Sequence, residues 1–393
     1  MSESGVFDAV VIGAGPAGAM SAKQIAASGR SVLLVDRGAF PRHKVCGCCL
    51  NLDALSTLAS AGLERQLAAL GGVPLKNLHL YCSKRSAVLP LPGGRSLSRY
   101  ALDWALIEAA VAAGATFRAG VAARVVLAEG QLGFPQVRLS RDELVTARSI
   151  VAADGLGGTS LRDLPGFEPR VARLSRCGLG GVTSRPISSQ TVPAGSIAMF
   201  IGRKGYLGAV SLEDGRIDFA AAVDPSLMKA CKNPVDAVTQ IAQEAKIDNR
   251  LPLEAVERWQ LTPKLTRHRP RVAAPRVFVV GDAAGYVEPF TGEGMAWALA
   301  SGHAVADAVS TAIDGRPLQA AAAWTAAQQR LIRRRQWNCR LAAGLLRRPR
   351  LTRAAVRVLA VTPQLARPAV RRISERSTGR PTGSLAVEGG ARR

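Results

Sequence analysis

The chain has 393 residues, of which 48% are hydrophobic and 21% are charged, and this balance excludes an intrinsically disordered protein. Its formal net charge of +23 is compatible with a nucleic acid or an anionic membrane surface as a partner. The seven cysteines are irregularly spaced, which argues against a disulfide framework. The first residues, MSESGVFDAVVIGAG, lack the features of a secretory signal, so export is not expected. The apolar runs are well short of the roughly 18 residues that a membrane-spanning helix needs.

The first motif is a glycine-rich turn between an expected strand, residues 7–12, and an expected helix, residues 16–28. A second apolar run ends at Asp36, eighteen positions after Gly18, where a carboxylate can accept hydrogen bonds from ribose hydroxyls. This strand, turn and helix pattern is typical of dinucleotide-binding proteins but does not separate NAD from FAD. We expect the cofactor to contact Gly13, Gly15, Ala17, Gly18, Asp36 and Arg37.

A cysteine-rich segment follows, in which Arg42, His43 and Lys44 precede Cys46, Cys48 and Cys49. The basic side chains would lower the pKa of the Cys46 thiol if they point toward it, whereas the alternative is a thiol that only fills space. Zinc sites normally draw two spaced pairs of ligands from different elements, and no second cluster is present. We therefore expect no metal.

The middle of the chain alternates between two kinds of hydrophobic pattern. A helical pattern at 102–113, strands at 116–118, 124–127 and 149–153, and a buried strand at 276–280 followed by a helix at 294–310 continue the first domain. Between them, short alternating strands at 196–201, 206–212 and 216–223 indicate an antiparallel layer. Tyr206, Phe200 and Phe219 are expected either to line a pocket or to lie in the core.

These elements predict an α/β fold in which a Rossmann-like FAD-binding domain, with a mixed parallel sheet in three layers, is interleaved with an antiparallel substrate domain. The expected boundaries are 1–75, 99–175 and 270–315 for the first domain and 76–98 and 176–269 for the second. An Arg-rich helical region is expected at 316–376 and a disordered tail at 377–393.

Two later segments resemble the FAD-dependent hydroxylases of the p-hydroxybenzoate hydroxylase type and the related geranylgeranyl reductases. Ala153-Asp154-Gly155 is similar to their strand-end Asp-Gly segment, and Gly281-Asp282 to the segment whose aspartate binds the ribityl chain of FAD. The resemblance implies FAD as cofactor and NADPH or NADH as reductant. Backbone N–H groups near Gly292 and Gly294 can approach a flat ring, and the helix that starts there directs its positive end toward reduced flavin. The resulting candidate residues are Asp154, Gly281, Asp282, Gly292, Gly294 and Met295.

The resemblance also assigns roles to two side chains nearer the N-terminus. Arg99 matches a position where an arginine approaches the cofactor, with a surface arginine at a helix start as the alternative. Cys46 and Gly47 match a Cys-Gly loop that faces the flavin, which makes Cys46 the candidate catalytic residue. The family usually continues with Gly or Glu, whereas this chain has Cys48.

Several reactions fit this pattern. The Gly205-Tyr206-Leu207-Gly208 turn and the Cys46 loop resemble bacterial monooxygenases, so hydroxylation of a lipophilic or aromatic substrate, phenolic or polyketide-like, is favoured slightly over hydride transfer to a prenyl double bond. The sequence lacks the Trp-x-Trp-x-Ile-Pro segment of flavin-dependent halogenases, which argues against halogenation. Cys46 and Cys49 form a Cys-x-x-Cys pair, but the pair lies outside the helix start where redox pairs usually act, so disulfide reduction is only a minor alternative. A non-enzymatic FAD-binding electron carrier is the remaining alternative.

Residues 330–393 contain 17 Arg against Glu375 and Glu388, so this region carries +15 of the total charge. One interpretation is an interfacial helix on anionic lipid at the inner membrane surface of an otherwise cytoplasmic protein. Nucleic acid is not expected, because Trp337 is almost the only aromatic residue available for base stacking. The simplest alternative is a solvated helical face that caps the active-site pocket.

Overall fold

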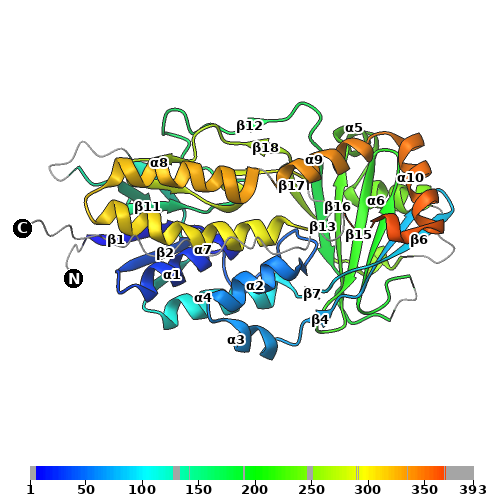
Figure 1. The fold of residues 1–393 in the computed structure, drawn as a ribbon, viewed down its shortest axis with the longest axis horizontal. Helices are drawn as coiled ribbons and strands as arrows, with labels where there is room; N and C mark the ends of the chain where they lie inside the picture. The colour runs from blue at the N-terminus through cyan, green and yellow to red at the C-terminus, as the bar shows by residue number, and fades with distance from the viewer. Residues whose placement is uncertain are drawn as a thin grey trace, which may run out of the picture.

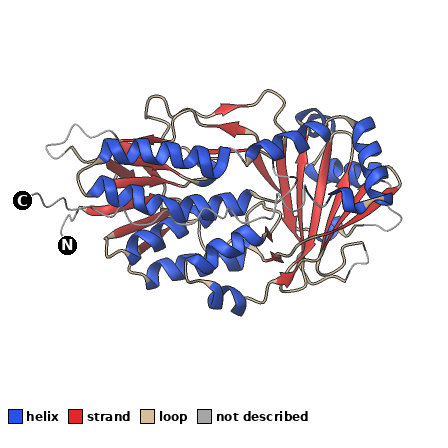
Figure 2. Cartoon of the chain, in the orientation of Figure 1, coloured by secondary structure: helices blue, strands red, loops and turns tan. Residues whose placement is uncertain are grey.

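The computed structural model describes residues 6–126, 133–140, 142–188, 191–245, 251–288, 290, 292–333, 335–366 and 368. The predicted tail at 377–393 lies outside these residues. The described chain forms two blocks side by side along the long axis, a helix-covered sheet and a steep antiparallel sheet (Figures 1 and 2).

The first block is built on a mainly parallel sheet in the order β19-β20-β11-β1-β2-β8. Its central strands read as nearly continuous apolar runs because both faces are covered. The short pair β9 and β10 extends β11 in antiparallel fashion. The strands are β1 (Phe7–Ile12), β2 (Val32–Asp36), β8 (Thr116–Ala119), β9 (Ala123–Val126), β10 (Gln136–Leu139), β11 (Leu144–Ala152), β19 (Ala273–Ala274) and β20 (Val277–Val279).

Helices cover one face of this sheet, and the other face packs against the β9–β10 pair and residues 161–167, which gives three layers. The helices α1 and α7 make the closest helix pair of the block. The bounds are α1 (Pro16–Ala27), α2 (Leu52–Ser60), α3 (Glu64–Ala69), α4 (Arg99–Ala112), α7 (Gly294–Ile313) and α8 (Pro317–Gln328).

The second block is a seven-stranded sheet in the order β17-β13-β16-β15-β14-β5-β6, antiparallel except for the β14–β5 pair. Helix α6 (Pro234–Ala245), preceded by α5 (Pro225–Ala230), buries its apolar face on one side of this sheet. The strands are β5 (Asn77–Cys82), β6 (Arg85–Pro90), β13 (Cys177–Val182), β14 (Ser196–Ile201), β15 (Gly205–Ser211), β16 (Ile217–Val223) and β17 (Gln260–Lys264). The mixed sheet with helices, the antiparallel block and the helical C-terminal region confirm the predicted fold class.

Two small three-stranded sheets join the blocks. Each is made of two-residue strands, too short to leave a periodic pattern in the sequence. One contains β3 (Cys49–Leu50), β7 (Arg95–Ser96) and β4 (Val73–Pro74), and the other contains β12 (Arg170–Val171), β18 (Arg267–His268) and β21 (Gly285–Tyr286).

The C-terminal region is helical as far as Ala366. A π-helical turn (Gln329–Arg333) links α8 to α9 (Gln336–Leu345), and α10 (Pro349–Val361) then packs on β6 and β5 before a final 3-10 turn (Pro363–Ala366). Pro349 lies in the first turn of α10, where a backbone N–H would have no partner within the helix, so proline costs no hydrogen bond there. In the described part of the chain, no helix combines the length and hydropathy needed to cross a bilayer.

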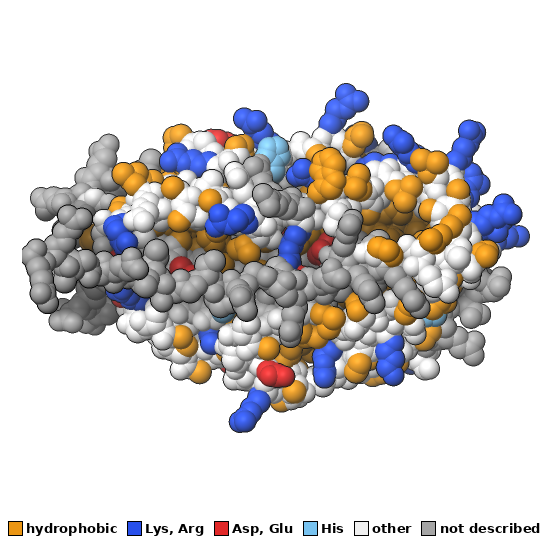
Figure 3. All heavy atoms as spheres, in the orientation of Figure 1, with side chains coloured by type: hydrophobic (Ala, Val, Ile, Leu, Met, Phe, Trp, Pro, Cys, Tyr) orange, Lys and Arg blue, Asp and Glu red, His pale blue; other side chains and the backbone are white. Residues whose placement is uncertain are grey.

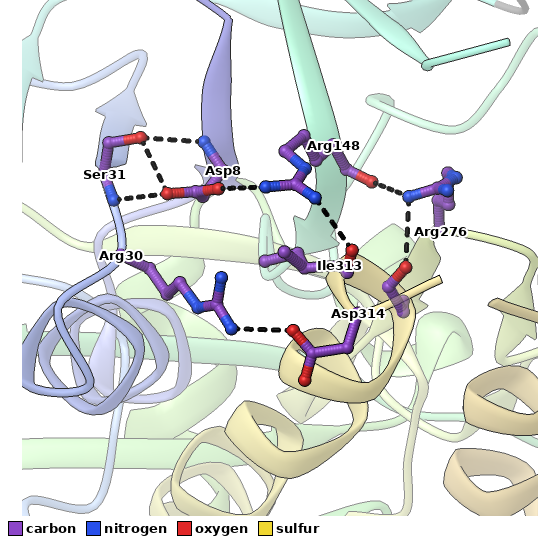
Figure 4. Close-up of polar contacts among 8 residues, drawn as sticks. Asp8, Arg30, Ser31, Arg148, Arg276, Ile313 and Asp314 are labelled. Atoms are coloured by element: carbon purple, nitrogen blue, oxygen red, sulfur yellow. Dashed lines mark hydrogen bonds and ion pairs between the residues drawn. The ribbon is translucent and has the colours of Figure 1, made fainter. Parts of the chain in front are cut away.

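A polar network ties together the end of the first block where β1 and β2 begin (Figure 4). Asp8 accepts hydrogen bonds from the Ser31 backbone N–H at 2.9 Å and from Arg148 at 3.2 Å. Arg148 in turn donates to the carbonyl of Ile313 at the C-terminus of α7, where a cation stabilises the helix dipole. Arg30 pairs with Asp314 at 2.8 Å, so the starts of β1 and β2, strand β11 and the C-terminal end of α7 are fixed to one another.

Candidate functional site

The glycine turn after β1 brings the backbone close to the neighbouring strand end. Gly13 has a φ of +103°, and a Cβ at this position would lie 2.5 Å from the carbonyl oxygen of Ala153. Only glycine fits both conditions. Gly15 caps α1, Pro16 occupies its first turn, and no acidic side chain is present there. The positive end of α1 is therefore exposed to an anionic ligand.

A cavity of about 840 Å³ opens beside this turn, within the size range of cofactor sites. The carboxyl ends of β1, β2 and β11 border it, which is where open α/β sheets bind ligands. Its lining contains both basic and acidic side chains, the acidic ones including Asp142 and Asp163. Among the predicted residues, Gly13, Gly15, Asp36, Arg37 and Asp154 line the cavity, together with the basic side chains of Arg42, His43, Lys44, Arg124 and Arg138.

Asp36 closes β2 and forms a dense set of hydrogen bonds. Its carboxylate accepts from the backbone N–H of Ala14 and of Gly38, each at 2.8 Å. Arg42 makes a two-pronged contact with the same carboxylate at 2.9 and 3.0 Å. In this structure Arg42 therefore covers the carboxylate that sequence analysis assigned to ribose hydroxyls.

Asp154 and Asp282 follow two parallel strands that pair in register. Asp154 accepts a hydrogen bond from the Ser160 N–H at 2.8 Å, which shapes the loop after β11. Burial raises the pKa of Asp282, although the positive charges of Lys44 and Arg99 act to lower it. The side chain of Lys44 thus connects the cavity to Asp282, and desolvation together with Arg99 lowers the pKa of its ammonium group.

Arg99 is buried, and not on the surface as one sequence interpretation allowed. It begins α4 and binds Asp103, one turn along the helix, through two contacts of 2.7 Å. A Cβ at Gly15 would lie 3.6 Å from the guanidinium of Arg99. The arginine therefore stands directly behind the glycine turn, with its charge balanced by a buried carboxylate.

The cysteine segment faces the loop that precedes α7. A Cβ added at Gly292 would lie 3.7 Å from Cβ of Cys49, and one added at Gly294 would lie 3.1 Å from the ring of Tyr286. Ala17, Gly18, Gly281 and Met295 belong to the packed helices and turns behind this loop, whereas Gly47 is exposed. The structure thus brings the cysteine segment and the start of α7 together.

The thiols of the segment differ in acidity. A hydrogen bond from Cys48 lowers the pKa of Cys46 to about 6, with a further contribution from the charge of Arg99. The same hydrogen bond and burial raise the pKa of Cys48, and burial raises that of Cys49. Cys46 is therefore the most acidic thiol of the segment, and its thiolate, the reactive form of cysteine, is the most accessible of the three.

A buried carboxyl group, Asp218, extends this cluster from the antiparallel sheet. Asp218 lies on β16, is 3% exposed, and hydrogen-bonds to the Cys48 side chain. Burial raises its pKa well above the usual range, and its Oδ2 has no hydrogen-bond partner within the described structure. The result is a carboxyl group whose protonated form is favoured by burial and which is linked through Cys48 to Cys46.

The sheet face that carries Asp218 is otherwise apolar. Tyr206 on β15 contacts Phe290 edge to face, with ring centres 5.2 Å apart, and Met199 and Ile201 on β14 lie beside them. Phe200 and Phe219 point to the opposite face and are fully buried under α6. Of the three aromatic residues considered as pocket liners, only Tyr206 lies on the face toward the cysteine segment.

Sequence reasoning missed Asp218, because a single acidic residue in an alternating strand has no spacing that indicates its role. It also missed the Arg42–Asp36 contact. Within the described residues, no group of three or more His, Cys, Asp or Glu side chains is arranged to hold a metal ion.

The glycine turn and the cavity at the strand ends are typical of the dinucleotide-binding class of proteins. The chain belongs to the FAD binding domain family, whose model matches residues 6–330. It is an FAD-dependent oxidoreductase of the p-hydroxybenzoate hydroxylase and geranylgeranyl reductase family, which confirms the resemblance found in the sequence.

Relatives with different activities share this fold. The chain is 26% identical to menaquinone reductase of Mycolicibacterium smegmatis over 77% of its length and 76% of the relative. A geranylgeranyl bacteriochlorophyll reductase-like protein of Thermoplasma acidophilum superposes with a TM-score of 0.73 at 19% identity, covering 93% of this chain and 98% of that one. PqsL, a probable FAD-dependent monooxygenase of Pseudomonas aeruginosa, superposes with a TM-score of 0.70 at 18% identity, covering 90% and 99%.

Proposed function

We propose that FAD lies with its pyrophosphate in the cavity beside the glycine turn and its flavin toward the start of α7, and that NADPH or NADH reduces it. The cavity carries this proposal, since its size, the basic side chains in its lining and the positive end of α1 fit a dinucleotide pyrophosphate. Asp36 holds the adenosine ribose, Asp282 the ribityl chain, and the backbone from Gly292 to Met295 the flavin ring. Arg37, Arg99 and Asp154 complete the site.

Bound FAD supplies hydride chemistry to the apolar face of the antiparallel sheet. The acceptor is then a lipophilic molecule that fits against Tyr206, Phe290 and Met199. We infer that the reaction is the reduction of a carbon–carbon double bond, which requires a hydride for one carbon and a proton for the other.

The chain of Asp218, Cys48 and Cys46 is suited to supply that proton. A donor works best when its pKa lies near the working pH, and Cys46, with a pKa of about 6, meets this condition. In the minority of molecules in which Cys46 carries its proton near neutral pH, the thiol donates that proton to the substrate carbon, and Asp218, whose protonated form burial favours, returns a proton to Cys46 through Cys48. The carboxyl group thus acts through the thiols and is a positioning and proton-storing residue.

Hydroxylation, the reaction slightly favoured by the sequence, is the second candidate. The segment Gly205–Gly208 that supported it was expected to form a turn, but it is the first part of strand β15. Hydroxylation requires activated oxygen beside the flavin. Thiolates of low pKa in that position are readily oxidised to sulfenic acid and beyond. An acidic thiol at Cys46 therefore favours double-bond reduction over hydroxylation.

The test is a product analysis with the purified, FAD-loaded protein, NADPH or NADH, and either a polyprenyl lipid or an alkylated phenol in detergent. Double-bond reduction predicts a product heavier by two hydrogens, formed with and without air. A product heavier by one oxygen, formed only in air, would instead establish hydroxylation. Reduction of the flavin with no change in any substrate would favour an electron carrier.

The role of Asp218 is tested in the same assay with the variant Asp218→Asn. We expect turnover to fall by about a hundredfold or more, in the range of general acid catalysis, while the rate of flavin reduction by the nicotinamide stays unchanged. A merely structural role would lower both rates or the FAD content together.

A further inference from the structure

The outer face of the C-terminal helices presents an apolar stripe to solvent. Trp337, Leu341 and Leu345 recur every four residues along α9, and the first two are 60% and 58% exposed. Residues spaced in this way lie on one side of a helix. Four further exposed apolar side chains continue this surface along α10 and the turn after it: Leu351, Val358, Val361 and Leu365.

Arginines surround this stripe. Five of them are exposed, and none pairs with an acidic side chain in the part of the chain that the structure describes. Figure 3 shows hydrophobic and basic side chains interspersed over the end of the molecule where Figure 1 places α9 and α10. The five are Arg340, Arg348, Arg350, Arg353 and Arg357.

The inner side of the same helices is anchored without any of these residues. Val356 and Leu346 pack into the core that contains Leu80 and Leu89. Arg347 contacts the buried Glu288 at 3.5 Å, and Glu288 also binds Arg176, which directly precedes β13, at 3.1 Å. The exposed apolar residues are therefore not needed to fold α9 and α10, and the anchored helices hold them in a fixed position.

This surface also adjoins the proposed substrate face. The core under α10 includes Tyr206, and Phe290 and Tyr286 pack against it. The Arg-rich region thus combines an apolar contact surface with a positive charge, and its inner side shares a core with the proposed substrate face.

We propose that the outer face of α9 and α10, defined by these apolar and arginine residues, docks on an anionic lipid bilayer. The apolar stripe would enter the boundary between headgroups and acyl chains, and the arginines would contact lipid phosphates. The net charge of +15 over residues 330–393 complements the negative surface. Nucleic acid is disfavoured because apolar side chains separate the arginines. The inference goes beyond the proposed chemistry and stands independently of it.

The experiment is co-sedimentation of the full-length, FAD-loaded protein with vesicles of phosphatidylcholine alone or mixed with phosphatidylglycerol. We expect binding to the anionic vesicles, at least tenfold weaker binding to the neutral ones, and loss of binding at high salt. Emission from the exposed Trp337 should shift to shorter wavelength on binding. Because binding is measured without substrate, its failure is separate from failure of the proposed reaction.

Two variants test the two components of the surface. The triple variant Trp337→Ser, Leu341→Ser, Leu345→Ser should bind at least tenfold more weakly, and Arg353→Glu with Arg357→Glu about a hundredfold more weakly. The matched control replaces equally exposed residues elsewhere, Leu174, Leu261 and Leu318, by serine and should bind like the natural chain.

Unchanged FAD content in every variant establishes that it folds. Equal vesicle binding by the triple variant and its control would overturn the proposal. So would tight binding to RNA that the arginine variant abolishes, in the absence of binding to vesicles.

Discussion

The acidity of Cys46 depends on its neighbour. Because the Cys48 thiol donates a hydrogen bond to Cys46, the thiolate is favoured and its pKa falls to about 6. We predict that alkylation of Cys46 by iodoacetamide rises with pH through a midpoint near 6. In Cys48→Ala the midpoint should move upward, toward the ordinary thiol range. Peptide mass mapping assigns the alkylated site, and an unchanged midpoint in the variant would show that Cys48 is not the cause.

Asp36 and Arg42 offer a second test at the level of single residues. If ribose hydroxyls bind the Asp36 carboxylate, Arg42 must release it when FAD enters. Asp36→Ala should therefore weaken FAD binding by about 10- to 100-fold, since buried donors and charge-assisted bonds lose their acceptor. Arg42→Met should retain FAD. Equilibrium titration of the apoprotein with FAD measures both, and loss of binding in Arg42→Met would instead make Arg42 a ligand of the cofactor.

The residues that could be predicted are those with a fixed place next to a strand end or a glycine turn, such as Gly13, Asp36 and Asp282. Asp218 could not be predicted, because it reaches the site across the sheet from a strand about 170 positions after Cys48. Arg99 was found only through its resemblance to a family position.

Among the elements, the contact between α1 and α7 is the tightest. A Cβ at Gly302 would lie 2.2 Å from the carbonyl oxygen of Ala17, so the two helices can approach only where this glycine stands. Gly302→Ala should lower the free energy of unfolding by about 2 kcal/mol, the usual cost of overpacking, and reduce FAD content. Urea unfolding measures the change.

Gly344→Ala is the matched control, since Gly344 lies in α9 with no atom near its missing Cβ. It should be neutral or stabilising by about 0.5–1 kcal/mol. Equal destabilisation by both substitutions would mean that the close approach of α1 and α7 is not the cause.

Periodicity identified elements of ordinary length well, and β14 has the bounds expected for it. The two-residue strands that join the blocks leave no pattern, so their sheets came only from the structure. The helix α6 was also missed, because it lies within a region whose strands dominated the interpretation.

At the scale of the molecule, the Asp8 network secures the end of the first block away from the cavity. Burial acts to raise the pKa of Asp8, but hydrogen bonds from Ser31 and Arg148 outweigh it and lower the pKa below the ordinary 3.8. A carboxyl group with a lowered folded-state pKa adds stability above pH 3.8 and loses it as the pH falls through the folded-state pKa.

Asp8→Asn should therefore be less stable than the natural chain by about 1–2 kcal/mol at pH 7, and the difference should shrink as the pH falls below 3.8. Glu143→Gln is the control, because its ion pair with Arg118 is half exposed and contributes little. Urea unfolding at several pH values tests this, and a difference that does not depend on pH would exclude the ionised Asp8 as its source.

The order of the domains along the chain could be predicted from the sequence, because the first block resumes at a parallel strand followed by a helix. The way in which α9 and α10 close one end of the antiparallel sheet was not, since it depends on buried contacts such as Arg176 with Glu288. The predicted boundaries between the domains stay predictions.

The measurement that tests the central claim most directly is the FAD content of the purified chain and of Gly13→Val. We predict about one FAD per natural chain, released on denaturation, and almost none in the variant, whose added side chain would meet the carbonyl of Ala153. A natural chain that contains no FAD and takes up none on reconstitution would contradict the account. A Gly13→Val variant that is folded and fully loaded would place the cofactor elsewhere.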